Sequence, residues 1–432
     1  MEEEYARECM NYHQRYLMDD HNLIDREVLL SVIRQFYEEI HLSLSDSEKQ
    51  FLKNSVLDKN TIFLEVAHDG QLPHLGIIRL ILKTYHLCTL IPNSMVLYFV
   101  GDHYSSNMCH ESTLFGIPQM GANPNKQRKP VVLKIGRKNQ HIPLKWIDSP
   151  TEEMLDDLKK SIHDWSTNNI AYERKKGNIT GDLTSVRDNI DKIIDLLKEN
   201  ADHVDNYGNW LIRVQYTLLR SLMGDEINRI IFLPFSAMHE LAKNEFSYYV
   251  EQTESINSIK REISEIQVLN GEIPYLKTDI SSNTMSFWLY CPSCKHRARP
   301  NRIDSDMIHY HCNVCKTDFQ DNLERLWPIM MPDIISFENA YFRIGICGWV
   351  VGSRAPYQEV IDKVYSDFYG IPTPPRFLLN SIPVYKGIGD PDDGYGRTTL
   401  LRALIESSPQ ELYQKLMAPW KENPYIASDL WR

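Results

Sequence analysis

The stretch EVAHDGQLPHLGIIRLIL, from Glu65 to Leu82, decides the fold expected for this chain. A short apolar run leads into a turn that contains Gly70 and Pro73, and His74 then opens a segment with helical periodicity. A second apolar run, SMVLYFVGDH, begins at Ser94. A strand, a helix and a strand in this order form a βαβ unit, so we expect a parallel sheet that binds its ligand at the carboxyl ends of the strands.

The pattern of expected secondary structure changes several times around this unit. Leu29, Ile33 and Phe36 recur on one face of an N-terminal helix, and Ser45 precedes a second helix. A third strand is expected at PVVLKIG, residues 130–136, and mixed α/β texture returns after the cysteine-rich segment. We therefore expect an α/β fold, a Rossmann-like parallel sheet interrupted by a helical and zinc-ribbon insertion.

These changes in the sequence pattern divide the chain into five expected segments. They are a helical N-terminal extension (1–59), the first half of a nucleotide-binding domain (60–150), a helical insertion (151–285), a zinc ribbon (286–320), and the second half of the catalytic domain with C-terminal helices (321–432). The helical insertion is expected from its periodicity, in which Leu183, Val186, Ile190, Ile193 and Leu197 lie on one stripe.

Composition limits the classes of function. The chain has 432 residues, 42% of them hydrophobic, which is enough for two or three packed domains. No apolar run approaches the roughly 18 residues of a membrane span, and the N-terminus lacks the features of a signal peptide. We expect a cytoplasmic protein without a membrane partner. The net charge of -11 opposes binding to a polyanion, although the basic stretch 123–140 is a local exception.

The cysteines carry the most specific local signal. CPSCKHRARPNRIDSDMIHYHCNVC contains two Cys-x-x-Cys pairs separated by 17 residues, which are Cys291 with Cys294 and Cys312 with Cys315. Four thiolates on two tight turns suit tetrahedral Zn2+ and leave no open coordination position, so the zinc is expected to be structural. The alternative is that a neighbouring histidine replaces one thiolate, and the candidates are His296, His309 and His311.

The turn and its surroundings resemble the His-Ile-Gly-His signature of class I aminoacyl-tRNA synthetases, and class I lysyl-tRNA synthetase in particular. The motifs appear in the family's order: FLEVAHDGQLPHLGIIRLIL, LYFVGDHYSSNM, the cysteine segment, and FRIGICGWVVGSRAPYQEVIDKVYSDFYGIPTPPRFLLNSIPVYKGIG. The resemblance covers residues 60–417 in patches. It implies a nucleotide-binding catalytic core that activates an amino acid with ATP.

The resemblance also implies roles for individual residues. His74 and Gly76 match the signature positions that contact the phosphates of ATP, whereas Ile77 stands where the family has a second polar residue. Gly345 falls in the family's Gly-rich active-site strand and is expected near the cofactor. The alternative for His74 is a hydrogen-bonded histidine at a strand-to-helix corner.

The second signature of the family is altered here. Where the family has the loop Lys-Met-Ser-Lys-Ser, this chain has the acidic loop DPDDG, residues 390–394. Carboxylates repel a triphosphate, so three explanations are open: the loop holds Mg2+, or Lys386 and Arg397 supply the missing charge, or activation by ATP has been lost. An exposed acidic turn without a role is the fourth.

The end of the second strand supplies further candidates. Asp102 and His103 are expected to be catalytic, and ligases of the same superfamily, such as the cysteine-adding enzyme of bacillithiol synthesis, have a similar Asp-His pair at this place. Substrate-binding roles are expected for His68, Asp69 and Asp102 at the same edge of the sheet. The alternative for Asp102 is a loop carboxylate that caps the segment following it.

Two classes of function are expected from these features. The first is a free-standing ligase that uses ATP and Mg2+ to activate lysine, a similar amino acid or another carboxylate, and transfers it to a small-molecule or carrier acceptor. The second is a catalytically silent paralogue that binds nucleotide, amino acid or a protein partner. An ordinary lysyl-tRNA synthetase ranks third, and tRNA is not an expected partner, because the chain has no room for an anticodon-binding domain after the acidic loop. The oligomeric state is left open.

Overall fold

The structure is a computed structural model of the chain. It describes residues 1–18, 22–69, 75–103, 133, 141–175, 184–269, 283–285, 287–304, 307–332, 342–352, 373–379 and 400–417. The strand expected at 130–136 lies outside the described residues apart from Leu133, which is buried.

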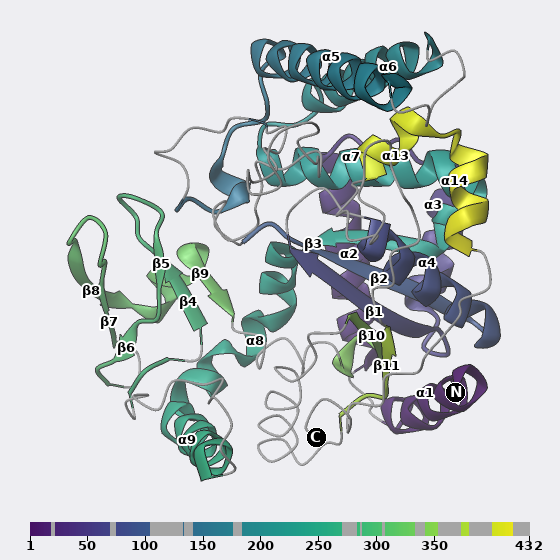
Figure 1. The fold of residues 1–432 in the computed structure, drawn as a ribbon. Coiled ribbons are helices and arrows are strands. Elements are labelled where there is room, and N and C mark those ends of the chain that lie inside the picture. Colours follow the sequence, from purple (N-terminus) through teal and green to yellow (C-terminus); the bar gives the residue numbers. More distant parts are fainter. Residues whose placement is uncertain are drawn as a thin grey trace.

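Five parallel strands form the central sheet (Figure 1). In chain order they are β1 (Ile62–Asp69), β2 (Ser94–Gly101), β3 (Ile230–Pro234), β10 (Ile346–Gly352) and β11 (Arg376–Leu379). The helix α4 (Leu75–Leu90) connects β1 to β2, so the predicted βαβ unit is confirmed. The return of the chain to the same sheet after the cysteine segment is confirmed as well, because β10 pairs with β1.

The order of the strands across the sheet is β11-β10-β1-β2-β3. If the five strands are numbered by their place in the chain and read from the other edge, the order is 3-2-1-4-5. This is the doubly wound arrangement, in which the direction of strand addition reverses between two central strands. Here the reversal falls between β1 and β10, so the crevice expected to bind ligand opens at the carboxyl ends of these two strands.

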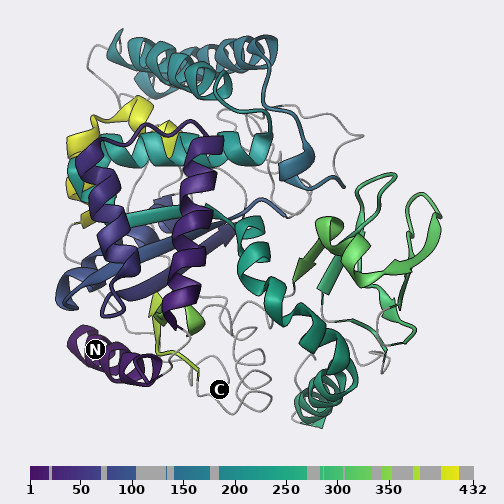
Figure 2. The same cartoon turned by 180° about the vertical axis from the view of Figure 1, so that it is seen from behind.

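Helices cover both faces of the sheet. The helix α4 packs on β1, β2 and β10, and the guanidinium of Arg26 in α2 (Asn22–Glu39) lies 4.5 Å from the ring centroid of Phe63 in β1. Seen from behind, α2 and α3 (Asp46–Leu57) cross the sheet as purple helices (Figure 2). The helix α1 (Glu2–Tyr16) docks against β10, where the Tyr5 hydroxyl donates to the Trp349 carbonyl oxygen at 3.1 Å.

The predicted N-terminal helices are confirmed in their details. Leu29, Ile33 and Phe36 are buried on one face of α2. Ser45 caps α3 with a complete capping box: its side chain accepts from the Glu48 amide, and the Glu48 carboxylate accepts from the Ser45 amide.

A helical layer follows β2 in the chain. It consists of α5 (Glu152–Lys175), α6 (Thr184–Ala201) and α7 (Tyr207–Met223), preceded by the short helix η2 (Leu144–Trp146) and followed by η3 (Gly224–Arg229). The expected stripe of α6 is buried at Val186, Ile190, Ile193 and Leu197. The C-terminal helices α13 (Leu400–Glu406) and α14 (Pro409–Met417) return to this layer, α13 against α6 and α14 against α7 and α4 (Figure 1).

The predicted helical insertion at 151–285 is wrong in one respect. It contains β3, which pairs with β2 at the edge of the central sheet, so the sheet is interrupted twice. The strand IIFLP is buried at all five positions. A run this short and uniformly apolar shows no period of two, and it cannot be told from a buried helix segment by pattern alone.

The second interruption contains α8 (Met238–Glu251), η4 (Phe235–Ala237) just before it, α9 (Thr253–Leu269) and the cysteine ribbon. The described residues of the ribbon form two antiparallel sheets. One contains β5 (Arg297–Ala298), β4 (Phe287–Tyr290) and β9 (Met330–Pro332), and the other contains β6 (Asn301–Arg302), β7 (Met307–His311) and β8 (Asp318–Asn322). The short helices α10 (Leu323–Leu326) and η5 (Trp327–Ile329) follow β8. The predicted end of the ribbon at residue 320 is therefore too early, because β9 completes the sheet around β4. Among the helices of the described residues, none is long and apolar enough to cross a membrane.

Candidate functional site

The carboxyl ends of β1 and β2 meet at one edge of the sheet. His68 pairs in register with Val100, and Asp69 pairs with Gly101, the last residue before Asp102. The structure therefore brings the predicted residues His68, Asp69, Asp102 and His103 to neighbouring strand ends. The predicted turn at 70–74, with His74, lies outside the described residues, and Gly76 is found in the first turn of α4 directly after it.

Asp102 is buried, with an exposed fraction of 2%, and its carboxylate is held by Ser236. The Ser236 amide donates to Oδ1 at 2.9 Å, and the Ser236 hydroxyl donates to Oδ2 at 2.5 Å. Ser236 lies in η4, directly before α8. The Asp102 carboxylate therefore caps the beginning of the segment that follows β3. A capping role for Asp102 was the alternative expected from the sequence, but the capped segment comes from a distant part of the chain.

Lys145 is a second member of this cluster, and no local pattern in the sequence marks it. Its amide donates to the Asp102 carbonyl oxygen at 3.1 Å. Its ammonium lies 4.7 Å from the ring centroid of Trp146 and 5.2 Å from that of Tyr290. Burial lowers the pKa of Lys145 and raises the pKa of Asp102, and the opposite charge of each group opposes the shift of the other. The Lys145 ammonium thus lies beside two aromatic rings, and its charge and that of Asp102 favour each other.

His103 follows Asp102 and is also buried. Its carbonyl oxygen accepts from the Tyr290 hydroxyl at 3.1 Å, and its ring centroid lies 5.1 Å from that of Phe235. Gly208 completes the packing around Asp102, because a Cβ at Gly208 would lie 3.1 Å from the Asp102 Cβ. His103 is thus contacted by two elements, η4 through Phe235 and β4 through Tyr290, that are far apart in the chain.

Gly345 lies at the amino ends of the strands, opposite the carboxyl ends just described, and directly precedes β10. Its carbonyl oxygen accepts from the Phe63 amide at 3.0 Å, at the amino end of β1. The glycine has a φ of +83°, and a Cβ there would lie 2.1 Å from the Arg26 Nη2. Arg26 therefore explains why residue 345 is a glycine. Gly345 lies at the ends of the strands away from the predicted ligand crevice, so this placement does not support its predicted contact with the cofactor, which stays a prediction.

Several other predicted residues lie outside the described residues. They are Lys386 and Arg397, the acidic loop 390–394, and nearly all of the basic stretch 123–140. Their roles with ATP, Mg2+ or phosphate remain predictions from the resemblance.

Glu65 is a buried carboxyl group in the middle of β1, paired in register with Leu97 and Trp349. Trp349 pairs in turn with Arg376, whose guanidinium lies 4.9 Å from the Trp349 ring centroid. Burial raises the pKa of Glu65 to about 8, and the positive charge of Arg376 opposes the rise. Glu65 is therefore mostly protonated at neutral pH in the folded chain.

We expect the Glu65→Gln variant to change the pH dependence of stability. The pKa of Glu65 is about 8 in the folded chain against 4.5 for an unperturbed glutamate, so its contribution to the free energy of unfolding is full below pH 4.5 and is lost as the pH rises through 8. Glutamine mimics the protonated form at every pH. The variant should be close to the parent in stability at pH 5 and be more stable by up to about 5 kcal/mol above pH 8.

Urea unfolding at pH 5, 6.5 and 8.5 measures this difference. The control is Glu153→Gln, which makes the same chemical change at an exposed position of α5. Equal pH slopes for the two variants would show that the Glu65 carboxyl does not titrate in this way.

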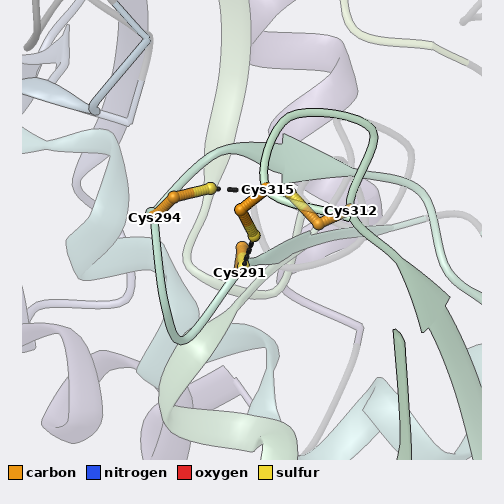
Figure 3. Close-up of side chains that lie close together, drawn as sticks. All are labelled: Cys291, Cys294, Cys312 and Cys315. Carbon is orange, nitrogen blue, oxygen red and sulfur yellow. Dashed lines mark hydrogen bonds between the residues drawn. The ribbon is translucent and has the colours of Figure 1, made fainter. Parts of the chain in front are cut away.

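The four predicted cysteines lie together in the ribbon (Figure 3). Their sulfur atoms are all within 4.8 Å of one another, and the Sγ–Sγ distances are 3.4 Å for Cys291 to Cys315 and 3.5 Å for Cys294 to Cys312. Tetrahedral Zn–S bonds place sulfurs about 3.8 Å apart, so the cluster can hold a structural metal such as zinc. The three neighbouring histidines are not part of this group of four.

Both knuckles of the ribbon have the same backbone pattern. The amide of Lys295 donates to the Cys291 carbonyl oxygen, and the amide of Lys316 donates to that of Cys312, each at 2.9 Å. Both lysines have a φ of 61°, in the left-handed region that few non-glycine residues adopt. The repeated turn aims each pair of sulfurs at a common point.

The sheet edge and the cysteine centre are thus two separate chemical sites, joined through Tyr290. The residues at the sheet edge come from distant parts of the chain, whereas the four cysteines all lie between residues 291 and 315. Neither can be assigned by similarity, because no protein-family model and no curated protein matches this chain.

Proposed function

We propose that the protein is an ATP-dependent ligase with a catalytic core like that of class I aminoacyl-tRNA synthetases. It activates lysine, a similar amino acid or another carboxylate, and transfers it to a small-molecule or carrier acceptor. ATP and Mg2+ are its proposed cofactors, and zinc has a structural role in the ribbon.

The strand order is the observation that carries this proposal. Doubly wound sheets bind nucleotides in the crevice where the strand order reverses, outside the carboxyl ends of the strands. The reversal here lies between β1 and β10, and the predicted His74-Leu75-Gly76 signature begins five residues after the end of β1. A resemblance based on short motifs and a sheet observed independently of it therefore point to the same crevice.

The elements around the crevice support binding of an anion. The helix α4 begins at Leu75, so its amino end directly follows residues 70–74, which connect it to β1 in the sequence. The first amides of a helix lack intrahelical acceptors, and the helix dipole favours negative charge there. In the proposed reaction this end of α4 and His74 hold the phosphates, while Asp102 and Lys145 shape the neighbouring wall.

A catalytically silent paralogue is the second candidate function, and the environment of Asp102 favours it. Both carboxylate oxygens of Asp102 accept hydrogen bonds from Ser236, so this group has a structural task whatever the chain does. A paralogue that only binds would keep the crevice and lose the catalytic charge of the second signature. An ordinary lysyl-tRNA synthetase remains third.

Calorimetry with ATP, ADP and AMP in the presence of Mg2+ tests the nucleotide, and a thermal-shift screen of amino acids with ATP tests the second substrate. The ligase predicts binding together with release of pyrophosphate or ADP in the presence of one amino acid. Binding without turnover indicates the silent paralogue. No binding of any nucleotide contradicts the proposal.

We expect His74→Ala to lower nucleotide-dependent turnover by about ten- to a thousandfold, with a smaller effect on nucleotide affinity. The reason is that a single placed donor contributes mainly where charge develops in the transition state. Steady-state kinetics and calorimetry separate the two effects. The control is His86→Ala near the other end of α4, where the imidazole pairs with Glu2 at 3.3 Å and should leave turnover unchanged.

A further inference from the structure

The strand β4 divides its side chains between two cores. Phe287 and Leu289 belong to the apolar cluster inside the ribbon, whereas Tyr290 belongs to the main core of the molecule and Trp288 packs against that core. Alternate residues of a strand point to opposite faces, which explains the division. Tyr290 is fully buried and is followed directly by the first metal-binding cysteine, Cys291.

The first knuckle also contacts the segment 141–147, which lies before the helical layer. The His141 Nε2 lies 3.1 Å from the carbonyl oxygen of Cys294, and the Lys295 ammonium lies 5.4 Å from the ring centroid of Trp146. The Trp146 ring meets Tyr290 edge to face at a centroid distance of 4.5 Å. The segment 141–147 is therefore held against the knuckle at both of its ends.

The same segment and the same tyrosine reach the carboxyl end of β2. The Lys145 amide donates to the Asp102 carbonyl oxygen, and the Tyr290 hydroxyl donates to the His103 carbonyl oxygen, each at 3.1 Å. Asp102 in turn accepts a hydrogen bond from the amide of Ser236 in η4, which directly follows β3. A continuous chain of contacts thus runs from the cysteine centre to the ends of two strands of the central sheet.

We propose that the metal centre holds the carboxyl end of β2 and the segment 141–147 in place, with Tyr290 as the positioning residue that connects them. A bound metal fixes the first knuckle, which begins at Cys291 directly after Tyr290. The knuckle then fixes Tyr290, whose hydroxyl and ring fix His103 and Trp146. This coupling is independent of which ligand the sheet edge binds, so its test does not depend on the proposed ligase activity.

Hydrogen exchange of the zinc-loaded chain, before and after treatment with a chelator, tests the coupling. Removal of the metal should speed exchange in 283–332 and also, by about tenfold or more, in 141–147 and 101–103. The amides of 62–69 serve as the internal reference and should not change. Faster exchange confined to 283–332 would overturn the proposal.

A pair of tyrosine variants isolates the role of Tyr290. Tyr290→Phe keeps the ring and removes the hydrogen bond to His103, and exchange in 101–103 and 141–147 should rise about three- to tenfold with zinc still bound. Tyr310→Phe is the matched control, because the Tyr310 hydroxyl donates to the His296 carbonyl oxygen at 2.9 Å, within the ribbon. Equal exchange in the two variants at 101–103 would overturn the proposal. If Tyr290→Phe loses its metal, the chelation experiment on the parent chain decides.

Discussion

The Gly345→Ala variant is expected to lose about 4–6 kcal/mol of folding free energy, most of the margin of a typical domain. The added Cβ would lie 2.1 Å from the Arg26 Nη2, and the φ of +83° is itself unfavourable for alanine. The far end of an arginine can usually move aside. Arg26 cannot do so cheaply, because it is fully buried and donates to the Tyr16 hydroxyl at 2.6 Å and to the carbonyl oxygens of Thr61 at 2.7 Å and Val56 at 3.2 Å.

Gly224→Ala is the matched control for this prediction. Gly224 also has a positive φ, of 58°, but a Cβ there would meet nothing within 4 Å. The control should therefore show only the backbone cost of roughly 1–3 kcal/mol for its unusual φ and ψ. Chemical denaturation of both variants gives the two free energies. A Gly345→Ala variant no less stable than Gly224→Ala would show that Arg26 does not constrain this position.

The purified chain is expected to contain one tightly bound zinc ion, and its removal should unfold the ribbon. Zinc bound by thiolates contributes roughly 10 kcal/mol or more to the folding of small metal domains. The ribbon has its own apolar cluster, separate from the main core, so the central sheet should stay largely folded. Elemental analysis measures the zinc, and limited proteolysis shows which part of the chain becomes accessible.

Single cysteine variants sharpen this test. Cys291→Ser and Cys312→Ser each remove one of the four clustered sulfurs and should lower the zinc content and destabilise the ribbon. Cys88→Ser makes the same change at a buried cysteine of α4 that lies outside the cluster, and it should retain one zinc per chain. A parent protein without zinc, prepared in the absence of chelators, would contradict the assignment.

Local patterns in the sequence determined the elements that depend on near neighbours. The βαβ unit follows from Glu65 to Gly101 because apolar runs, turn residues and helical periodicity act over a few residues. The spacing of the four cysteines located the metal centre for the same reason, since each knuckle is a tight turn. The capping box of Ser45 and Glu48 is equally local.

Only the tertiary structure decided which distant segments meet. Residues 230–234 became a strand of the sheet because β2 offered a free edge, not because their own pattern required it. Asp102 pairs with Ser236, and Tyr290 pairs with His103, because groups buried by packing need hydrogen-bond partners. Gly345 is required by an arginine that lies far away in the chain. Such pairs are set by the shape and polarity of the assembled core, and a short stretch of sequence contains neither.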